Sequence, residues 1–173
     1  EGAAEPELRF RGFSGKWKLR RLSDFVKEVT RVDASSHAPV MMITAANGFI
    51  NQSERYSFDN SGQSLQKYIL LKQGELAYNH GASKLRPFGS CFVLREKEAR
   101  VPFVYHCFSV TDNYADFVAL ELNGNFVERQ LRRIVSSSAR MDGLLNISFE
   151  EYCTVKIALP CQEEQRKIGN FFR

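Results

Sequence analysis

The stretch that decides the fold is residues 101–110, with the sequence VPFVYHCFSV. It is the densest run of strand-forming side chains in the chain, and apolar residues occupy both of its alternating faces. Because a strand with one face in water shows polar alternation instead, this pattern is typical of a strand that is covered on both faces. We therefore expect a central strand here, with Cys107 packed as a small buried hydrophobe.

Shorter apolar runs on either side of this stretch predict further strands. Asn47-Gly48 supplies a turn signal within one pair, and Gln73-Gly74 supplies one within another. The expected strands cover residues 40–44, 49–50, 68–71, 76–79, 91–94 and 155–159. Between two of them, residues 80–90 carry glycine, proline and two cations, which predicts a basic loop.

Helical spacing of apolar side chains predicts helices elsewhere. Ser23-Asp24 predicts a helix start, and Asn123-Gly124 predicts a break between two helices in the middle of the chain. The expected helices begin at residue 23 and cover 114–122, 125–135 and 161–173. Together these patterns predict a single α+β domain, with a twisted mixed β-sheet flanked by helices, that ends in the start of a long C-terminal helix.

The composition limits the class of protein. With 173 residues and 43% hydrophobic side chains, the chain can bury an ordinary single-domain core. No apolar run approaches the ~20 residues that cross a bilayer, and the first residues lack the apolar segment of a secretory signal. We therefore expect a soluble, cytoplasmic protein. A net charge of +4 permits a polyanionic partner without requiring one.

The residues that enzymes and metal sites require do not gather in this sequence. The four cysteines form no Cys-x-x-Cys pair, and the three histidines stand at no metal-ligand spacing near them. An amino methyltransferase needs an Asp/Asn-Pro-Pro-aromatic element, and no Pro-Pro occurs. Neither Asp116 with Glu121 nor a histidine with Ser83 or Cys107 forms a persuasive nuclease or nucleophile set. We expect no enzymatic activity, no cofactor and no metal ion.

The two ends of the chain and three internal motifs carry a resemblance to a known family. The opening holds Pro6-Glu7-Leu8-Arg9-Phe10, Gly12-Phe13 and Trp17, and the close holds Leu159-Pro160 followed by Glu163-Glu164-Gln165. Between them stand Gly48-Phe49-Ile50, the strand-turn-strand run 68–79 with Glu75 where the family commonly has Asp, and Ser137-Ser138-Ala139-Arg140 with Leu144-Leu145-Asn146-Ile147-Ser148. In this order, the motifs resemble a target recognition domain from the specificity subunit of a Type I restriction-modification system.

This resemblance implies a DNA reader that performs no chemistry itself. In the family, two such domains each read one half of a bipartite site in double-stranded DNA, and separate modification and restriction subunits supply methyl transfer and cleavage. Long helices after each domain set the spacing and dock the modification subunits. The polar residues 1–8, with Gly2 and Pro6, predict a flexible lead-in. Carried onto the rest of this chain, the resemblance implies a recognition domain at 9–160 and the start of a truncated spacer helix at 161–173.

Two basic segments supply the side chains that DNA reading needs. We expect the connection at residues 79–89 and the one that follows residue 135 to be exposed and to approach base edges, while the arginines of the 125–135 helix contact phosphates. The candidate DNA-binding residues are Asn79, His80, Ser83, Lys84, Arg86, Arg129, Arg132, Arg133, Ser138 and Arg140. The alternative is a protein-interaction module that docks modification subunits without binding DNA.

Overall fold

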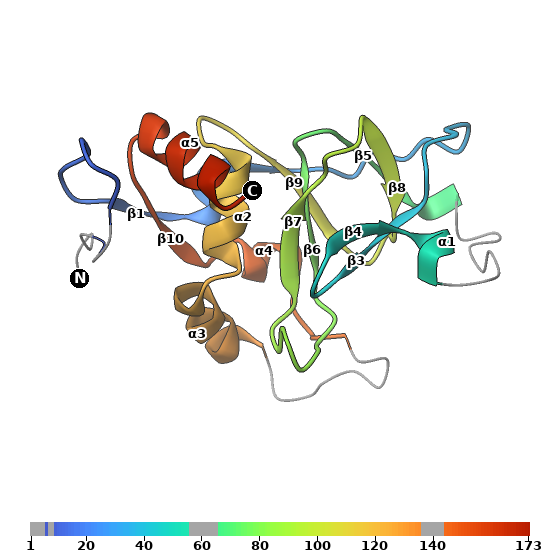
Figure 1. Ribbon diagram of the computed structural model, residues 1–173. Coiled ribbons are helices and arrows are strands. Elements are labelled where there is room, and N and C mark those ends of the chain that lie inside the picture. The colour runs from blue at the N-terminus through green and yellow to red at the C-terminus, as the bar shows by residue number, and fades with distance from the viewer. Residues whose placement is uncertain (1–5, 7–8, 56–65, 136–143) are drawn as a thin grey trace.

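The computed structural model describes residues 6, 9–55, 66–135 and 144–173. They form one α+β domain, so the predicted fold class is confirmed. Figure 1 shows the helices α2, α3 and α5 on one side with a two-stranded ribbon, and the other strands on the opposite side. The lead-in that we expected at residues 1–8 lies outside the described residues, apart from Pro6.

A four-stranded antiparallel sheet forms the centre of the domain. Its strands, in spatial order, are β2 (Val26–Glu28), β9 (His106–Val110), β6 (Leu76–Asn79) and β7 (Ser90–Val93). Phe108 of β9 packs in one buried cluster with the helices, whereas the adjacent Cys107 packs in a second cluster on the other face. The prediction of a central strand buried on both faces is confirmed for β9. Residues 102–105 form a turn that separates it from β8 (Glu98–Val101).

Two smaller antiparallel sheets cover the second face of the central sheet. They pair β3 (Met41–Thr44) with β4 (Gly48–Asn51), and β5 (Ile69–Lys72) with β8; the short helix α1 (Gln52–Arg55) follows β4. The predicted turn at Asn47-Gly48 is confirmed. Gly48 has a φ of +69°, and a Cβ there would lie 3.0 Å from the Phe92 ring, so both the backbone conformation and the close packing favour glycine.

Glu75 stabilises the turn between β5 and β6. Its carboxylate accepts a hydrogen bond from the Lys72 backbone N–H at 2.7 Å and two from the Arg31 guanidinium at 3.0 and 3.1 Å. These bonds raise the pKa of Arg31. The predicted strand-turn-strand run is confirmed, although β5 and β6 pair with different neighbours rather than with each other.

A two-stranded ribbon joins the beginning of the chain to its end. It pairs β1 (Lys18–Arg21) with β10 (Lys156–Leu159). The expectation of a helix beginning at Ser23-Asp24 is wrong, because only a 3-10 turn, η1 (Leu22–Asp24), forms before β2. The backbone N–H groups of Leu22 and Ser23 donate to the carbonyls of residues 155 and 153 instead of to a helix. Tertiary pairing therefore overrides the local helical spacing.

Helices occupy much of the second half of the chain. They are α2 (Ala115–Leu122), α3 (Asn125–Ile134), α4 (Phe149–Tyr152) and α5 (Gln162–Phe171). The predicted break at Asn123-Gly124 is confirmed. We did not predict α4, which begins with a capping box in which Ser148 and Glu151 exchange side chain-to-backbone hydrogen bonds of 3.1 and 2.7 Å. Across the described ranges, no helix is long and apolar enough to cross a membrane.

Two buried polar residues, rather than its phenylalanines, anchor α5. Glu164 and Gln165 are 0% and 2% exposed, whereas Phe171 and Phe172 are 67% and 64% exposed. The Glu164 carboxylate accepts two hydrogen bonds of 2.7 Å from the Arg9 guanidinium. Arg9 also donates to the carbonyls of residues 14 and 15, so one side chain organises the N-terminal segment and holds α5 on it.

Gln165 fixes α5 to the beginning of α2. Its side-chain oxygen accepts a hydrogen bond of 2.9 Å from the Tyr114 backbone N–H, and its nitrogen donates to the Asn113 side chain at 2.9 Å and to the Pro160 carbonyl at 3.0 Å. Gly169 permits close packing there, because a Cβ would lie 2.8 Å from the Tyr114 ring. The two helices are therefore tied together by polar contacts that are buried from water.

Replacing Glu164 with alanine should lower the free energy of unfolding by about 3 kcal/mol, because it leaves the mostly buried Arg9 guanidinium without its counter-charge. Glu163→Ala is the matched control, since Glu163 is the exposed neighbour in the same helical turn. We expect the control to change stability by less than about 0.5 kcal/mol. Urea unfolding followed by circular dichroism measures both. Equal effects of the two variants would contradict the role assigned to the ion pair.

The cysteines should differ sharply in reactivity. Cys91, Cys107 and Cys153 are buried, Cys161 is exposed, and all four are free thiols. Burial raises the pKa of the three buried thiols, that of Cys153 to about 12, so their reactive thiolates are scarce at neutral pH. Titration with Ellman's reagent should find one fast thiol in the native protein and four after denaturation. Cys161→Ser should remove the fast one, and a second fast thiol in that variant would contradict the packing.

Candidate nucleic-acid interface

The loop between β6 and β7, residues 80–89, is closed by its own hydrogen bonds. The Ser83 N–H donates to the Arg86 carbonyl at 3.1 Å, and the Arg86 N–H donates back to the Ser83 hydroxyl at 3.0 Å. The Gly89 N–H donates to the same carbonyl at 3.2 Å. The loop therefore presents the exposed residues Ser83, Lys84 and Leu85 at the tip of a preformed turn.

Close packing around Gly89 and a hydrogen bond from Tyr78 fix the base of this loop on the sheet. Gly89 has a φ of +80°, and a Cβ there would lie 2.5 Å from the Asn79 carbonyl oxygen and 2.7 Å from the Tyr78 ring. The Tyr78 hydroxyl donates a hydrogen bond of 2.6 Å to the Phe88 carbonyl. Because the ring of Tyr78 is itself buried in the core, the loop is anchored to the centre of the domain.

Asn123, between α2 and α3, connects the loop to the helices. Its carbonyl accepts a hydrogen bond of 2.8 Å from the Arg86 guanidinium, and its side chain exchanges two hydrogen bonds, of 3.0 and 2.6 Å, with the backbone of Cys91. In addition, the Arg132 guanidinium lies over the Phe88 ring at 5.3 Å from its centre. The two basic segments, which are separate in the sequence, are therefore neighbours in space.

Two sets of contacts determine which side of α3 faces the solvent. Val127 and Leu131 are buried on the inner side. The Gln130 side chain exchanges two hydrogen bonds of 2.8 Å with the backbone of Lys156 in β10. As a result the arginines of α3 point to solvent, as the amphipathic pattern predicted.

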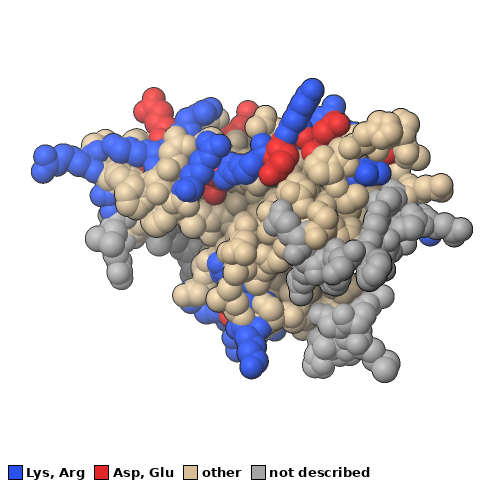
Figure 2. Space-filling view, turned by 45° about the vertical axis from the view of Figure 1, so that its right-hand side comes forward, with Lys and Arg blue, Asp and Glu red and all other residues tan. Residues whose placement is uncertain are grey.

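We call the combined surface of the loop tip and the outer side of α3 the basic face. Figure 2 shows a small group of Lys and Arg side chains at the lower edge of the molecule, where α3 lies in Figure 1, and further Lys and Arg side chains interspersed with Asp and Glu along the upper edge. Glu128 is 3.5 Å from Arg132 in an exposed pair, which neutralises little of this charge. Grouped cations of this kind suit a polyanion, because each phosphate contact releases a counterion. The basic face consists of Ser83, Lys84, Leu85, Arg129, Arg132 and Arg133.

The expectation that the whole 79–89 connection is exposed is wrong at its base. His80 is only 6% exposed. The Asn79 side chain donates to the Ile43 carbonyl at 3.2 Å and accepts from the Gly81 N–H at 2.9 Å, and Arg86 is half-buried against Asn123. These side chains satisfy backbone groups of the domain. Ser138 and Arg140 lie outside the described residues.

His80 joins three segments inside the domain. Its Nδ1 is 2.7 Å from the Leu145 carbonyl oxygen and its Nε2 is 2.7 Å from the Val104 carbonyl oxygen. The ring stacks on His106 at 5.0 Å between centres, and the Nε2 of His106 is 2.9 Å from the Ile147 carbonyl oxygen. Burial lowers the pKa of His106, and the neighbouring His80 lowers it further. The two histidines therefore hold the segment before α4 against the central sheet.

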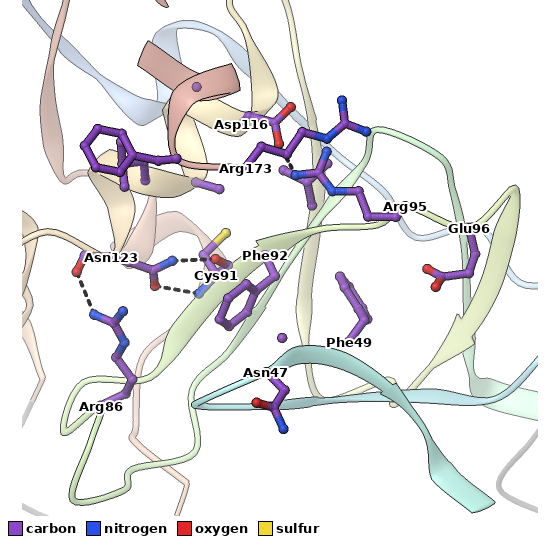
Figure 3. Close-up of a pocket in the computed structure, with 16 residues that line it drawn as sticks. Asn47, Phe49, Arg86, Cys91, Phe92, Arg95, Glu96, Asp116, Asn123 and Arg173 are labelled. Atoms are coloured by element: carbon purple, nitrogen blue, oxygen red, sulfur yellow. Dashed lines mark hydrogen bonds and ion pairs between the residues drawn. The ribbon is translucent and has the colours of Figure 1, made fainter. Parts of the chain in front are cut away.

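A cleft of about 340 Å³ lies between the β3–β4 turn, β7 and the helices α2 and α5 (Figure 3). The half-buried rings of Phe49 and Phe92 supply apolar surface, and Arg95 is ion-paired with Asp116 on the opposite wall. Its described lining contains no histidine, serine or lysine, so it offers no nucleophile paired with a nitrogen base. In the part of the chain that the structure describes, no group of three or more His, Cys, Asp or Glu is placed to hold a metal ion.

A second cavity, of about 440 Å³, lies between α5 and the N-terminal segment and is mainly apolar. Glu121 reaches this cavity from α2, and burial raises the pKa of its carboxyl to about 7. Phe171 and Phe172 border the cavity while remaining largely exposed. The remaining lining residues are Arg9, Phe10, Trp17, Leu120 and Ile168.

No protein-family model matches the sequence, and no curated protein matches it. Among solved structures, the HsdS subunit from Thermoanaerobacter tengcongensis is similar, with 17% sequence identity and a TM-score of 0.49. The similarity covers 96% of this chain. It covers 38% of that structure, so this chain spans well under half of its length.

Sequence reasoning missed the residues that hold the basic face together. Asn123 was predicted only as a helix break, yet it connects the loop, β7 and the two helices. Tyr78 was expected only as a strand residue, although its hydroxyl anchors the loop. The available signal is chemical type: a tyrosine in a strand and an asparagine at a helix junction both carry polar groups that need partners when buried.

Glu121 should make stability fall as pH rises from about 4.5, the ordinary value of its pKa, to about 7, its value in the folded chain. In this range the folded state keeps a proton that the unfolded chain has lost, so rising pH favours unfolding. Glu121→Gln, which cannot ionise, should therefore be more stable than the wild type at pH 8 by on the order of 2 kcal/mol. Thermal unfolding at pH 5 and pH 8 tests this, with Glu163→Gln as control. A difference in melting temperature between Glu121→Gln and the wild type that is the same at both pH values would contradict this role of Glu121.

Proposed function

We propose that this chain is a non-catalytic, sequence-specific DNA recognition domain that reads one half-site for the specificity subunit of a Type I restriction-modification complex. The observation that carries this proposal is the basic face. Two cationic segments from different parts of the sequence meet there, and both are held by hydrogen bonds and a cation–π contact to other elements of the domain. Cations on a rigid surface position a protein on phosphates, while side chains on a projecting loop reach base edges.

The residues at the borders of the domain support the family part of the proposal. The sequence motifs that resemble the recognition-domain borders include Arg9 at one end and Glu164-Gln165 at the other. These residues contact each other or the start of α2 in the folded chain. Contacts between the two ends of a domain are expected when that domain folds independently.

The absence of catalysis is proposed from the sequence motifs. The chain has no Pro-Pro element to hold a target amino group, and its glycines do not follow a strand in the pattern of a cofactor turn. Methyl transfer and cleavage would then belong to the modification and restriction subunits of the same system, which are the proposed protein partners.

The strength of binding by a single domain should be modest. A good bidentate base contact contributes ~1 to 3 kcal/mol of discrimination, so one domain that reads a few base pairs has limited specificity. Two domains on a rigid spacer bind jointly, and this multiplies avidity by roughly 100-fold or more. We therefore propose that this chain recognises DNA tightly only as part of a longer assembly.

One observation favours the alternative function of a protein-interaction module. Phe171 and Phe172 are exposed beside a mainly apolar cavity at the end of α5. Apolar surface of this kind is typical of contacts with protein rather than with DNA. In this alternative the exposed arginines of α3 also face a partner subunit, and the chain has no salt-dependent affinity for DNA.

Fluorescence anisotropy with a labelled duplex of random sequence, titrated at several salt concentrations, separates the two functions. We expect the affinity to fall steeply with salt, and we expect Arg129→Ala/Arg133→Ala to reduce the log–log slope by about 1 to 2, since each lost phosphate contact removes about 0.9. Lys72→Ala/Lys97→Ala is the matched control: it removes the same charge from exposed residues at the other end of strands β6 and β7.

The control should keep the wild-type slope. A wild-type chain without salt-dependent affinity would leave only the interaction module. An arginine variant that binds like the wild type would remove α3 from the interface.

A further inference from the structure

Leu85 stands at the tip of the loop between Lys84 and Arg86, and it is 62% exposed. Phosphate binding needs cations and gains nothing from a leucine. An exposed leucine also adds nothing to the core, because its side chain remains in water. Neither charge nor burial in the core therefore accounts for this large, exposed apolar side chain on the basic face.

The turn that carries Leu85 is closed by hydrogen bonds. The hydrogen bonds between Ser83 and Arg86 close the turn beneath the tip, and the Arg86 guanidinium is tied to the Asn123 carbonyl at 2.8 Å. Gly89 and the Tyr78 hydroxyl fix the returning strand. The tip is thus presented outward before any partner binds, and little conformational entropy is lost when it makes a contact.

The chemistry of a DNA duplex offers one apolar group at a base edge. This is the C5-methyl group of thymine, which lies in the major groove. The minor groove displays only polar edges there, and insertion of a side chain between base pairs would first require unstacking them. A leucine beside the exposed Lys84, on a turn closed by hydrogen bonds, matches a thymine methyl group next to a phosphate contact.

We propose that Leu85 is a specificity-determining residue that recognises thymine through its methyl group in the major groove. This inference rests on the proposed DNA-binding function and assigns one base contact within it. Lys84 and the arginines of α3 supply the charge that holds the tip in the groove, and Leu85 distinguishes thymine from the other bases.

The test begins with selection of preferred sequences by the wild-type chain from a random duplex library. In the selected duplex, each thymine is then replaced singly by deoxyuridine, which removes the methyl group and leaves the base pair intact. We expect one position at which this change weakens binding about fourfold, the value of one buried methyl group. Leu85→Ala should bind both duplexes equally and should keep the wild-type salt slope, because no charge is lost.

Val32→Ala is the control for loss of an exposed apolar side chain. Val32 is 50% exposed in the segment between β2 and β3, which Figure 1 shows at the upper right, whereas the β6–β7 loop is at the lower edge. This variant should keep the fourfold effect of the methyl group. Circular dichroism and thermal unfolding verify that both variants are folded, as the exposure of the two side chains predicts.

The outcomes separate this inference from the proposed function. If the wild type shows no salt-dependent DNA binding, both fail. If it binds DNA with the expected salt dependence but no deoxyuridine replacement weakens binding, or if Leu85→Ala keeps the fourfold effect, the thymine contact is overturned and DNA binding stands. A Leu85→Ala variant that loses affinity equally for all duplexes also overturns the thymine contact. That result would indicate that Leu85 inserts between base pairs instead of contacting one methyl group.

Discussion

The rest of the structure depends on the ion pair between Arg9 and the buried Glu164. A carboxylate taken out of water without a partner costs several kcal/mol, so α5 can pack on the domain only when the N-terminal segment delivers the Arg9 guanidinium. The β1–β10 ribbon brings the same two regions together through backbone pairing. The ion pair and the ribbon therefore both hold the two ends of the domain together.

The contacts that hold α5 on the domain are connected through α2 to the basic face. Gln165, next to Glu164, ties α5 to the start of α2, and the far end of α2 leads into Asn123. Asn123 then positions both the loop that carries Lys84 and Leu85 and the beginning of α3. A buried polar contact at one end of α2 is thus connected to the basic face through packed elements, and such a scaffold holds recognition side chains more accurately than a mobile loop does.

The two exposed surfaces differ in chemistry and lie on different elements. The basic face on α3 and the β6–β7 loop is cationic, which suits DNA, whereas the end of α5 exposes phenylalanine beside an apolar cavity, which suits protein. The proposed function, in which the domain reads DNA for subunits on other chains, would use both kinds of surface. Separating them allows the two contacts to form at the same time, and the buried ion pair and the Gln165 contacts hold them in a constant relative position.

The sequence by itself determined those features that depend on neighbouring residues. The central strand, the turn at Asn47-Gly48, the break at Asn123-Gly124 and the solvent-facing arginines of α3 all follow from short-range periodicity and turn chemistry. Only the tertiary structure decided that no α-helix begins at Ser23-Asp24, that His80 is buried and that the buried Glu164 anchors α5. The physical reason is that burial of a polar group depends on a partner far away in the chain, and local pattern carries no information about that partner.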